Sequence, residues 1–150
     1  MVPAKNLIEQ LKLQEGLPGG QPALTAYWDP IGNVWTIGYG HTPSNEGETI
    51  DAARAEQLLV EDVQKALNLT LEKISIAHDL DEVRFSTLVN MVFNMGVDGV
   101  LKFKNMLKAI GLSDWDVAAD QMKDSLWAEQ VGTRAITLEA QMRTGQWGDV

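Results

Sequence analysis

The sequence contains no cysteine and only two histidines, His41 and His78, among its 150 residues. The absence of cysteine excludes disulfide bonds, thiolate zinc sites and cysteine nucleophiles. Two imidazoles are too few for a histidine-rich metal centre, so we expect no metal ion and no other cofactor. Any catalysis must then depend on carboxylates, hydroxyls or basic side chains.

Positive charge is also scarce, because 12 lysines and arginines face 21 aspartates and glutamates and the net charge is −9. No segment forms a basic patch, so we do not expect nucleic acid as a partner. Long apolar runs are missing too: Lys5, Glu9 and Lys12 interrupt the first helix-forming segment, and no stretch reaches membrane-spanning length. We therefore expect neither a signal peptide nor membrane insertion.

The composition is that of an ordinary globular protein, with 45% hydrophobic and 22% charged residues. Apolar residues at helical spacing predict a first helix over residues 4–14. The segment GLPGGQP, residues 16–22, predicts a loop. Residues 24–42 are rich in aromatic and β-branched side chains, which predicts a hairpin with strands near 25–28 and 34–39.

The rest of the chain predicts helices. Asp51 can cap a long helix that runs to about residue 74. A helix from Asp81 to Gly96 is apolar nearly all round, which is typical of a central buried helix. Shorter helices are expected near three ranges: 99–110, 114–123 and 133–142.

These elements predict an α+β fold in one domain, residues 1–150. A small N-terminal lobe (about 15–50) would carry the hairpin or a sheet, and a long connecting helix (about 51–74) would follow. An all-helical lobe (about 75–150) would include the first helix. A cleft between the lobes is the natural place for a ligand.

Two carboxylates and one hydroxyl are candidates for glycoside hydrolysis, which needs an acid and a second group on the opposite face of the sugar. Glu15 ends the first helix, Asp29 lies in the hairpin turn, and Thr36 begins the next strand. The alternative interpretation is structural: Glu15 would be a solvated helix end and Asp29 an Asx-turn residue before proline.

Several segments match a known family in order. LQEGL (13–17) and AYWDPIGNVWTIGYGHT (26–42) resemble the catalytic signature of phage-type lysozymes, and the segments 81–107, 115–135 and 143–147 continue the resemblance. It covers nearly the whole chain and implies a lysozyme-like fold. It also implies an endolysin that hydrolyses the β-1,4 bond between N-acetylmuramic acid and N-acetylglucosamine in bacterial peptidoglycan, for host lysis.

The resemblance also implies residue roles. Glu15 would be the general acid, Asp29 the carboxylate that activates water or stabilises positive charge, and Thr36 the hydroxyl that holds the water. Arg134 would pair with Glu15, and His41 with Asp62 would form a structural pair. The residues that would line the sugar groove are Phe93, Asn94 and Gln121. The segment 16–28 is longer than in the family, and we expect the extra residues to form a surface loop.

Two other functions stay open. A lytic transglycosylase needs the acid but not the residues that position water. A non-catalytic peptidoglycan-binding module needs none of the three candidate catalytic residues. The joint presence of Glu15, Asp29 and Thr36 therefore favours a hydrolase. The resemblance further implies a monomer that accumulates in the host cytoplasm and reaches the wall after a holin opens the membrane.

Overall fold

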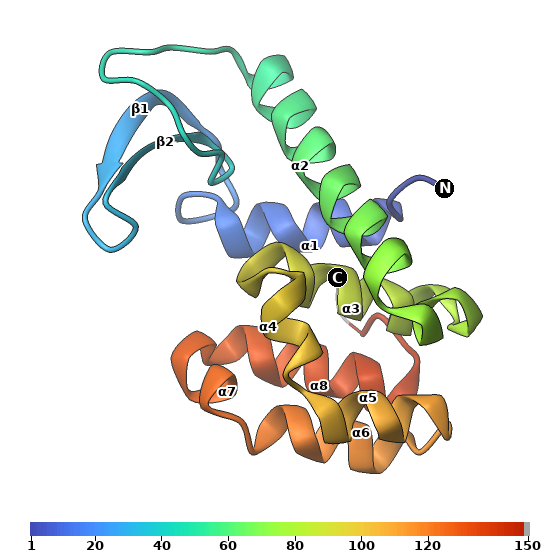
Figure 1. Ribbon diagram of the computed structural model, residues 1–150. Helices are drawn as coiled ribbons and strands as arrows, with labels where there is room; N and C mark the ends of the chain where they lie inside the picture. The colour runs from blue at the N-terminus through green and yellow to red at the C-terminus, as the bar shows by residue number, and fades with distance from the viewer. Residues whose placement is uncertain (149–150) are drawn as a thin grey trace. The chain divides into compact units, whose positions relative to one another are not determined.

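A computed structural model of the chain describes residues 1–148 and contains a β-hairpin followed mostly by helices (Figure 1). The predicted α+β class is confirmed. The backbone divides into two compact units, Met1–Lys65 and a second that begins at Ala66. Whether both belong to one domain, with the first helix in the helical lobe, stays a prediction.

The first unit contains helix α1 (Lys5–Glu15), strands β1 (Ala23–Asp29) and β2 (Val34–Gly38), and the start of helix α2 (Ala52–Lys73). The predicted helix, loop and hairpin are therefore present, with β1 starting two residues earlier than expected. The α2 helix continues into the second unit. Asp51 caps it as predicted, because its Oδ1 accepts a hydrogen bond from the Arg54 backbone N–H at 2.8 Å.

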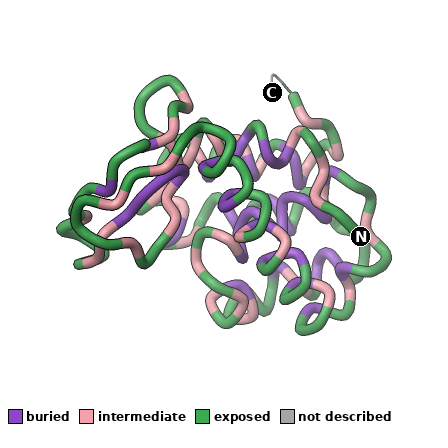
Figure 2. Tube along the Cα trace, turned by 90° about the horizontal axis from the view of Figure 1, so that it is seen from above, coloured by how far each residue is buried: buried purple, intermediate pink, exposed green. Residues whose placement is uncertain are grey.

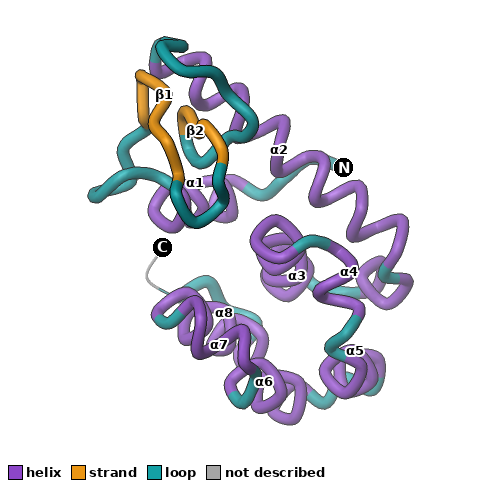
Figure 3. The backbone as a smooth tube through the Cα atoms, turned by 60° about the vertical axis from the view of Figure 1, so that its left-hand side comes forward, coloured by secondary structure: helices purple, strands orange, loops and turns teal. Residues whose placement is uncertain are grey.

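The register of the hairpin decides which side chains share a face. The antiparallel pairs are Tyr27 with Thr36, Trp28 with Trp35, and Asp29 with Val34. Because successive strand residues point to opposite faces, Tyr27, Asp29 and Thr36 lie on one face and the two tryptophans on the other. Figure 3 shows the two strands of this hairpin in orange. The strands are joined by the four-residue stretch PIGN between Asp29 and Val34, which contains the turn formers proline, glycine and asparagine.

The tryptophan face packs on α2. Ala26 from β1, Ile37 from β2 and Leu58 from α2 form a buried cluster, with Trp35 and Ile50 packed against it. Burial of this apolar face orients the sheet, since a one-residue slip would expose the whole set. The face that carries Tyr27 is thereby the one left for other contacts.

The second unit is helical. Its elements are η1 (Ser75–Asp79), α3 (Glu82–Met95), α4 (Val97–Leu101), α5 (Lys104–Gly111), α6 (Trp115–Lys123), α7 (Leu126–Val131) and α8 (Thr133–Thr144). The single helix expected over 99–110 is wrong, because two helices stand there. Phe103 leaves the helical conformation at φ −77°, ψ 60°, and its ring packs edge-on against Trp127. That long-range contact has no signature in the local sequence, and η1 and α7 were not expected either.

Helix α3 is the buried centre of this unit, as its apolar pattern predicts, and nine of its residues are buried. Figure 2 shows in purple the buried residues along the chain. Asp81 caps its start by accepting from the Arg84 N–H at 3.1 Å. Arg84 also donates to the Met142 carbonyl at 2.7 Å and stacks 4.0 Å from the Trp115 ring centre. One arginine thus joins α3, α6 and α8. Within residues 1–148, no helix has both the length and the apolar character needed to cross a membrane.

Candidate active site

Glu15 is the last residue of α1, and the chain turns sharply after it. The Gly16 N–H donates to the Lys12 carbonyl at 3.0 Å. A Cβ at Gly16 would lie 2.6 Å from that same carbonyl oxygen and 2.9 Å from the Gln21 carbonyl, so only glycine fits. Leu17 and Gln21 pair across the following turn. The predicted loop is therefore a closed turn attached directly to Glu15.

A second tight turn lies against the Glu15 carboxylate. Ile37 and His41 exchange backbone hydrogen bonds of 3.0 and 2.8 Å and close this turn around Gly40. Gly40 has φ +76°, and a Cβ there would lie 3.3 Å from Glu15 Oε2. The His41 Nδ1 lies 2.7 Å from the Asp62 Oδ2 on α2. The structure thus brings His41 and Asp62 together and holds the turn that borders Glu15.

Asp29 and Thr36 lie on the same hairpin face. The Asp29 Oδ1 accepts a hydrogen bond from the Ile31 N–H at 2.9 Å, so the Asx turn of the structural interpretation is present. Gly32 leaves room for the other carboxylate oxygen, because a Cβ there would lie 2.9 Å from it. The Thr36 hydroxyl has only a long contact of 3.5 Å to the Val34 carbonyl. The turn therefore orients the carboxylate without using both of its oxygens.

The charges of both candidate carboxylates affect the pKa of Tyr27. Burial raises the pKa of its phenol, and the charges of Asp29 and then Glu15 raise it further. The charges of both carboxylates therefore act on the same phenol. Tyr27 is also the strand partner of Thr36. The first unit thus places Asp29 and Thr36 on the hairpin face of Tyr27, and the charge of Glu15 acts on the same phenol.

The second unit holds the candidate sugar-binding residues. Asn94, near the end of α3, accepts a hydrogen bond on its Oδ1 from the Trp127 indole N–H at 2.7 Å. The same indole packs edge-on against Phe103, with ring centres 6.2 Å apart. Phe93 is half-buried, so it is not simply a core residue. Trp127, which the sequence analysis missed, therefore links Asn94 to the start of α5.

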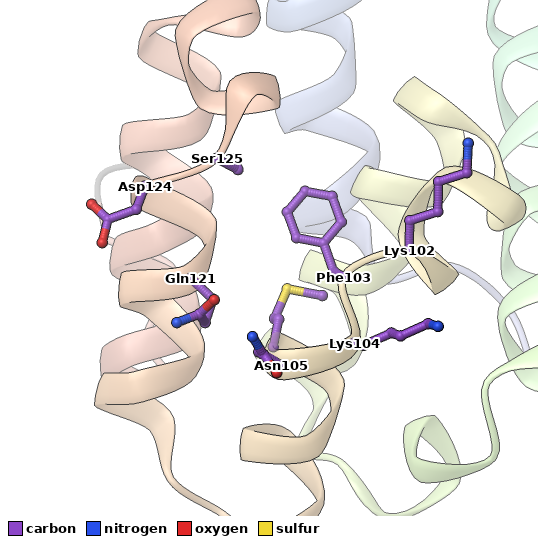
Figure 4. A pocket seen from close by; sticks show the side chains of 8 residues that line it. Lys102, Phe103, Lys104, Asn105, Gln121, Asp124 and Ser125 are labelled. Carbon is purple, nitrogen blue, oxygen red and sulfur yellow. The ribbon is translucent and has the colours of Figure 1, made fainter.

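A pocket of about 350 Å³ opens beside Phe103 (Figure 4). Gln121 on α6 and Asn105 on α5 bring their amides to the same opening, and the Phe103 ring lies between α6 and Lys102 in this view. The mixed amide and aromatic lining suits a polar ligand with apolar faces, such as a sugar. The lining residues are Lys102, Phe103, Lys104, Asn105, Met106, Gln121, Asp124 and Ser125.

Arg134, on α8, is fixed within its own unit. Its Nε donates to the Oδ1 of the fully buried Asn90 at 3.0 Å. The guanidinium is therefore held in a defined orientation by α3. Its pairing with Glu15 in the other unit stays a prediction.

Three further residues belong to this description, and their sequence signals differ. Glycines in the segment 38–40 indicated that backbone is closely approached there. Gly40 is approached by the Glu15 side chain, a partner that the sequence did not indicate. Tyr27 and Trp127 had no signal beyond being aromatic. Their places follow from the hairpin register and from the packing of α7, which only the folded chain supplies.

The β-hairpin followed by helices is consistent with a lysozyme-like fold. Sequence comparison identifies the family. A family profile described as "Phage lysozyme" matches residues 15–143. The chain belongs to the phage lysozyme family.

Three proteins illustrate the similarity of this chain to known relatives. The "Probable T4-type lysozyme 2" of Dictyostelium discoideum is 32% identical over 168 residues, covering 93% of this chain and 95% of that protein. The "Probable T4-type lysozyme 1" of the same organism is 37% identical over 101 residues, covering 64% of this chain and 58% of that protein. The "Pre-baseplate central spike protein Gp5" of Enterobacteria phage T4 is 29% identical over 170 residues. That match covers 95% of this chain but only 28% of the spike protein.

Proposed function

We propose that the protein is an N-acetylmuramidase, which hydrolyses the β-1,4 bond between N-acetylmuramic acid and N-acetylglucosamine in bacterial peptidoglycan. The observation that carries the proposal is that Asp29 and Thr36 share the hairpin face of Tyr27, while the charges of Asp29 and Glu15 both act on its phenol. Membership of the phage lysozyme family supports the same substrate class. The relatives named as T4-type lysozymes support it further.

The proposed reaction is a single displacement at the anomeric carbon. Glu15 donates its proton to the glycosidic oxygen as the bond between that oxygen and the anomeric carbon breaks. A water held by Thr36 and Asp29 forms the new carbon–oxygen bond and passes a proton to Asp29. The Asx turn supports this role, because a carboxylate that is already oriented needs no rearrangement at the moment of reaction.

We propose that Phe93, Asn94 and Gln121 bind the glycan. The pocket beside Gln121 and the anchoring of Asn94 by Trp127 support these roles. Arg134 is proposed to pair with Glu15 and to hold its carboxylate in place. Its orientation by Asn90 supports this, since a guanidinium held at one nitrogen presents its other donors in a fixed direction.

Glu15→Gln tests the proposal directly, because an amide cannot protonate the leaving oxygen. We expect a loss of at least about 10²-fold in the release of reducing ends from purified sacculi. Glu9→Gln is the matched control, since Glu9 is an exposed carboxylate on the same helix. Near-wild-type turnover by the Glu15 variant would remove Glu15 from the mechanism.

The same incubation separates the alternatives. A hydrolase releases new reducing ends, a lytic transglycosylase releases anhydro-sugars, and a binding module releases neither. Anhydro-sugars as the main product would replace the hydrolase with the transglycosylase. Retention on sacculi without any product would leave only binding.

The proposed reaction inverts the anomeric configuration. A water between Asp29 and the sugar requires carboxyl groups roughly 6.5–9.5 Å apart, whereas a covalent route needs about 5–5.5 Å. NMR of freshly released sugar should show the α anomer before mutarotation. A β product would contradict the role given to Asp29.

We further propose that a monomer of this enzyme, one domain over residues 1–150, serves host lysis and reaches the wall through membrane holes made by a holin. Expression in a sensitive host should cause lysis only when a pore-forming partner is supplied. Lysis without that partner would contradict this route. The spike relative favours a second use, in which the same fold acts from a virion.

A further inference from the structure

Tyr27 lies on the hairpin face that holds Asp29 and Thr36. It pairs directly with Thr36 across the hairpin, and directly opposed side chains lie about 4.5–5.5 Å apart at Cβ. Its neighbour Trp28 points to the opposite face, where it packs against Trp35 at 5.6 Å. The strand therefore gives these two adjacent aromatic residues different surroundings.

Tyr27 is the exposed member of its pair. Thr36 is 3% exposed, whereas Tyr27 is 38% exposed. Because the two side chains lie next to each other on one face, a ligand that approaches Thr36 meets the Tyr27 ring and hydroxyl. Tyr27 thus forms much of the surface that a substrate would touch beside Asp29.

The Tyr27 hydroxyl is available as a hydrogen-bond donor. Within residues 1–148, no hydrogen bond joins it to another residue. Burial raises the pKa of this phenol, and the charges of Asp29 and Glu15 raise it further. The group therefore keeps its proton at every pH at which the two carboxylates could work together.

We propose that Tyr27 is a further catalytic residue, whose hydroxyl donates a hydrogen bond to the N-acetylated sugar held between Glu15 and Asp29. The ligand class rests on the function proposed above, but the contact itself rests on the hairpin. A sugar presents acceptor oxygens around its ring, and a neutral donor on this face can bind one of them without adding charge. The ring beneath the hydroxyl offers an apolar face to the same sugar.

The first experiment observes the contact without needing turnover. Tyr27 and Tyr39 are the only two tyrosines, so ¹³Cζ-labelled tyrosine should give two resonances. In the Glu15→Gln protein, a purified tetrasaccharide of alternating N-acetylglucosamine and N-acetylmuramic acid should shift the resonance that Tyr27→Phe removes. The Tyr39 resonance should stay, since that ring is buried under Lys12. An unmoved Tyr27 signal at saturating sugar overturns the proposal.

The second experiment measures kinetics on sacculi. Tyr27→Phe removes one oxygen and should lower kcat/KM about tenfold, the effect of one hydrogen bond made to the bound sugar. Tyr39→Phe makes the same chemical change at a buried position and should stay within twofold of the wild type. A melting temperature equal to that of the wild type separates the lost contact from a lost fold.

The two proposals fail differently. Should the wild type release no reducing ends, hydrolysis is wrong, while the NMR titration still decides whether Tyr27 touches the sugar. Should the wild type be active and Tyr27→Phe equally active, with no NMR shift, the role of Tyr27 is wrong and the hydrolase stands.

Discussion

Replacing Gly40 by alanine tests whether the turn at residues 37–41 holds the general acid in place. The new Cβ would lie 3.3 Å from Glu15 Oε2, which is closer than ordinary contact, so the carboxylate must move by a few tenths of an ångström. The atom in the way is the far end of a side chain rather than backbone, so we expect its displacement to change stability little. It is harmful for catalysis, because the atom is the one that we propose delivers the proton.

Gly47→Ala is a control that separates these two effects. Gly47 has φ +81° against +76° for Gly40, but a Cβ there meets nothing within 4 Å. Both variants should lose about 1–2 kcal/mol from the left-handed backbone alone. For a chain of this length, that lowers the melting temperature by roughly 2–8 °C. Circular dichroism should therefore show similar losses in the two proteins.

Activity should distinguish the two variants. A misplacement of about 1 Å at a catalytic group can cost on the order of 10²-fold, so a few tenths of an ångström should cost roughly 3–10-fold. Reducing-end release from sacculi, measured well below both melting temperatures, should fall by that factor in Gly40→Ala and stay unchanged in Gly47→Ala. Equal activity in the two variants would refute the claim that the turn positions Glu15.

The remaining predictions concern the fold and the electrostatics. Leu138→Ala, at a fully buried position of α8, should lower the free energy of unfolding by roughly 2–5 kcal/mol in urea titrations, and a loss below 1 kcal/mol would mean that the helical core closes around the cavity. Asp62→Asn weakens the 2.7 Å contact to His41 and should destabilise the protein by about 1–3 kcal/mol; an unchanged unfolding midpoint would show that the pair contributes nothing. The raised pKa of Tyr27 means that the folded state binds the phenolic proton more tightly, so this group's contribution to stability is present below about pH 10 and declines as the pH rises further. Asp29→Asn should lower the pKa of Tyr27 in an NMR titration, and no change would place the Asp29 carboxylate away from the phenol.

Local sequence was enough to predict the hairpin, the long helix and the central buried helix. Each has a strong local signal: turn residues after Asp29, a capping aspartate at Asp51, and an apolar helix that starts at Asp81. Such signals act within a few residues, so the chain shows them before it folds.

The predicted helix over 99–110 failed for the opposite reason. The apolar spacing there suits one helix, but Phe103 leaves the helical conformation and packs against Trp127, which lies 24 residues further along the chain. A contact between distant residues outweighed a weak local preference. No pattern within the segment itself could have revealed the break.

The residue types of the candidate site were present in the sequence, since Glu15, Asp29 and Thr36 stand out once the family resemblance is seen. Their surroundings were decided by tertiary structure. Glycine at position 40 was visible, but its approach to Glu15 depends on how one turn packs against a helix end. Tyr27 became part of the site through strand register. Because Tyr27 pairs with Thr36, and not with Trp35, its ring lies on the same face as Thr36. Sequence thus determines which groups are available, and packing and register determine which of them meet.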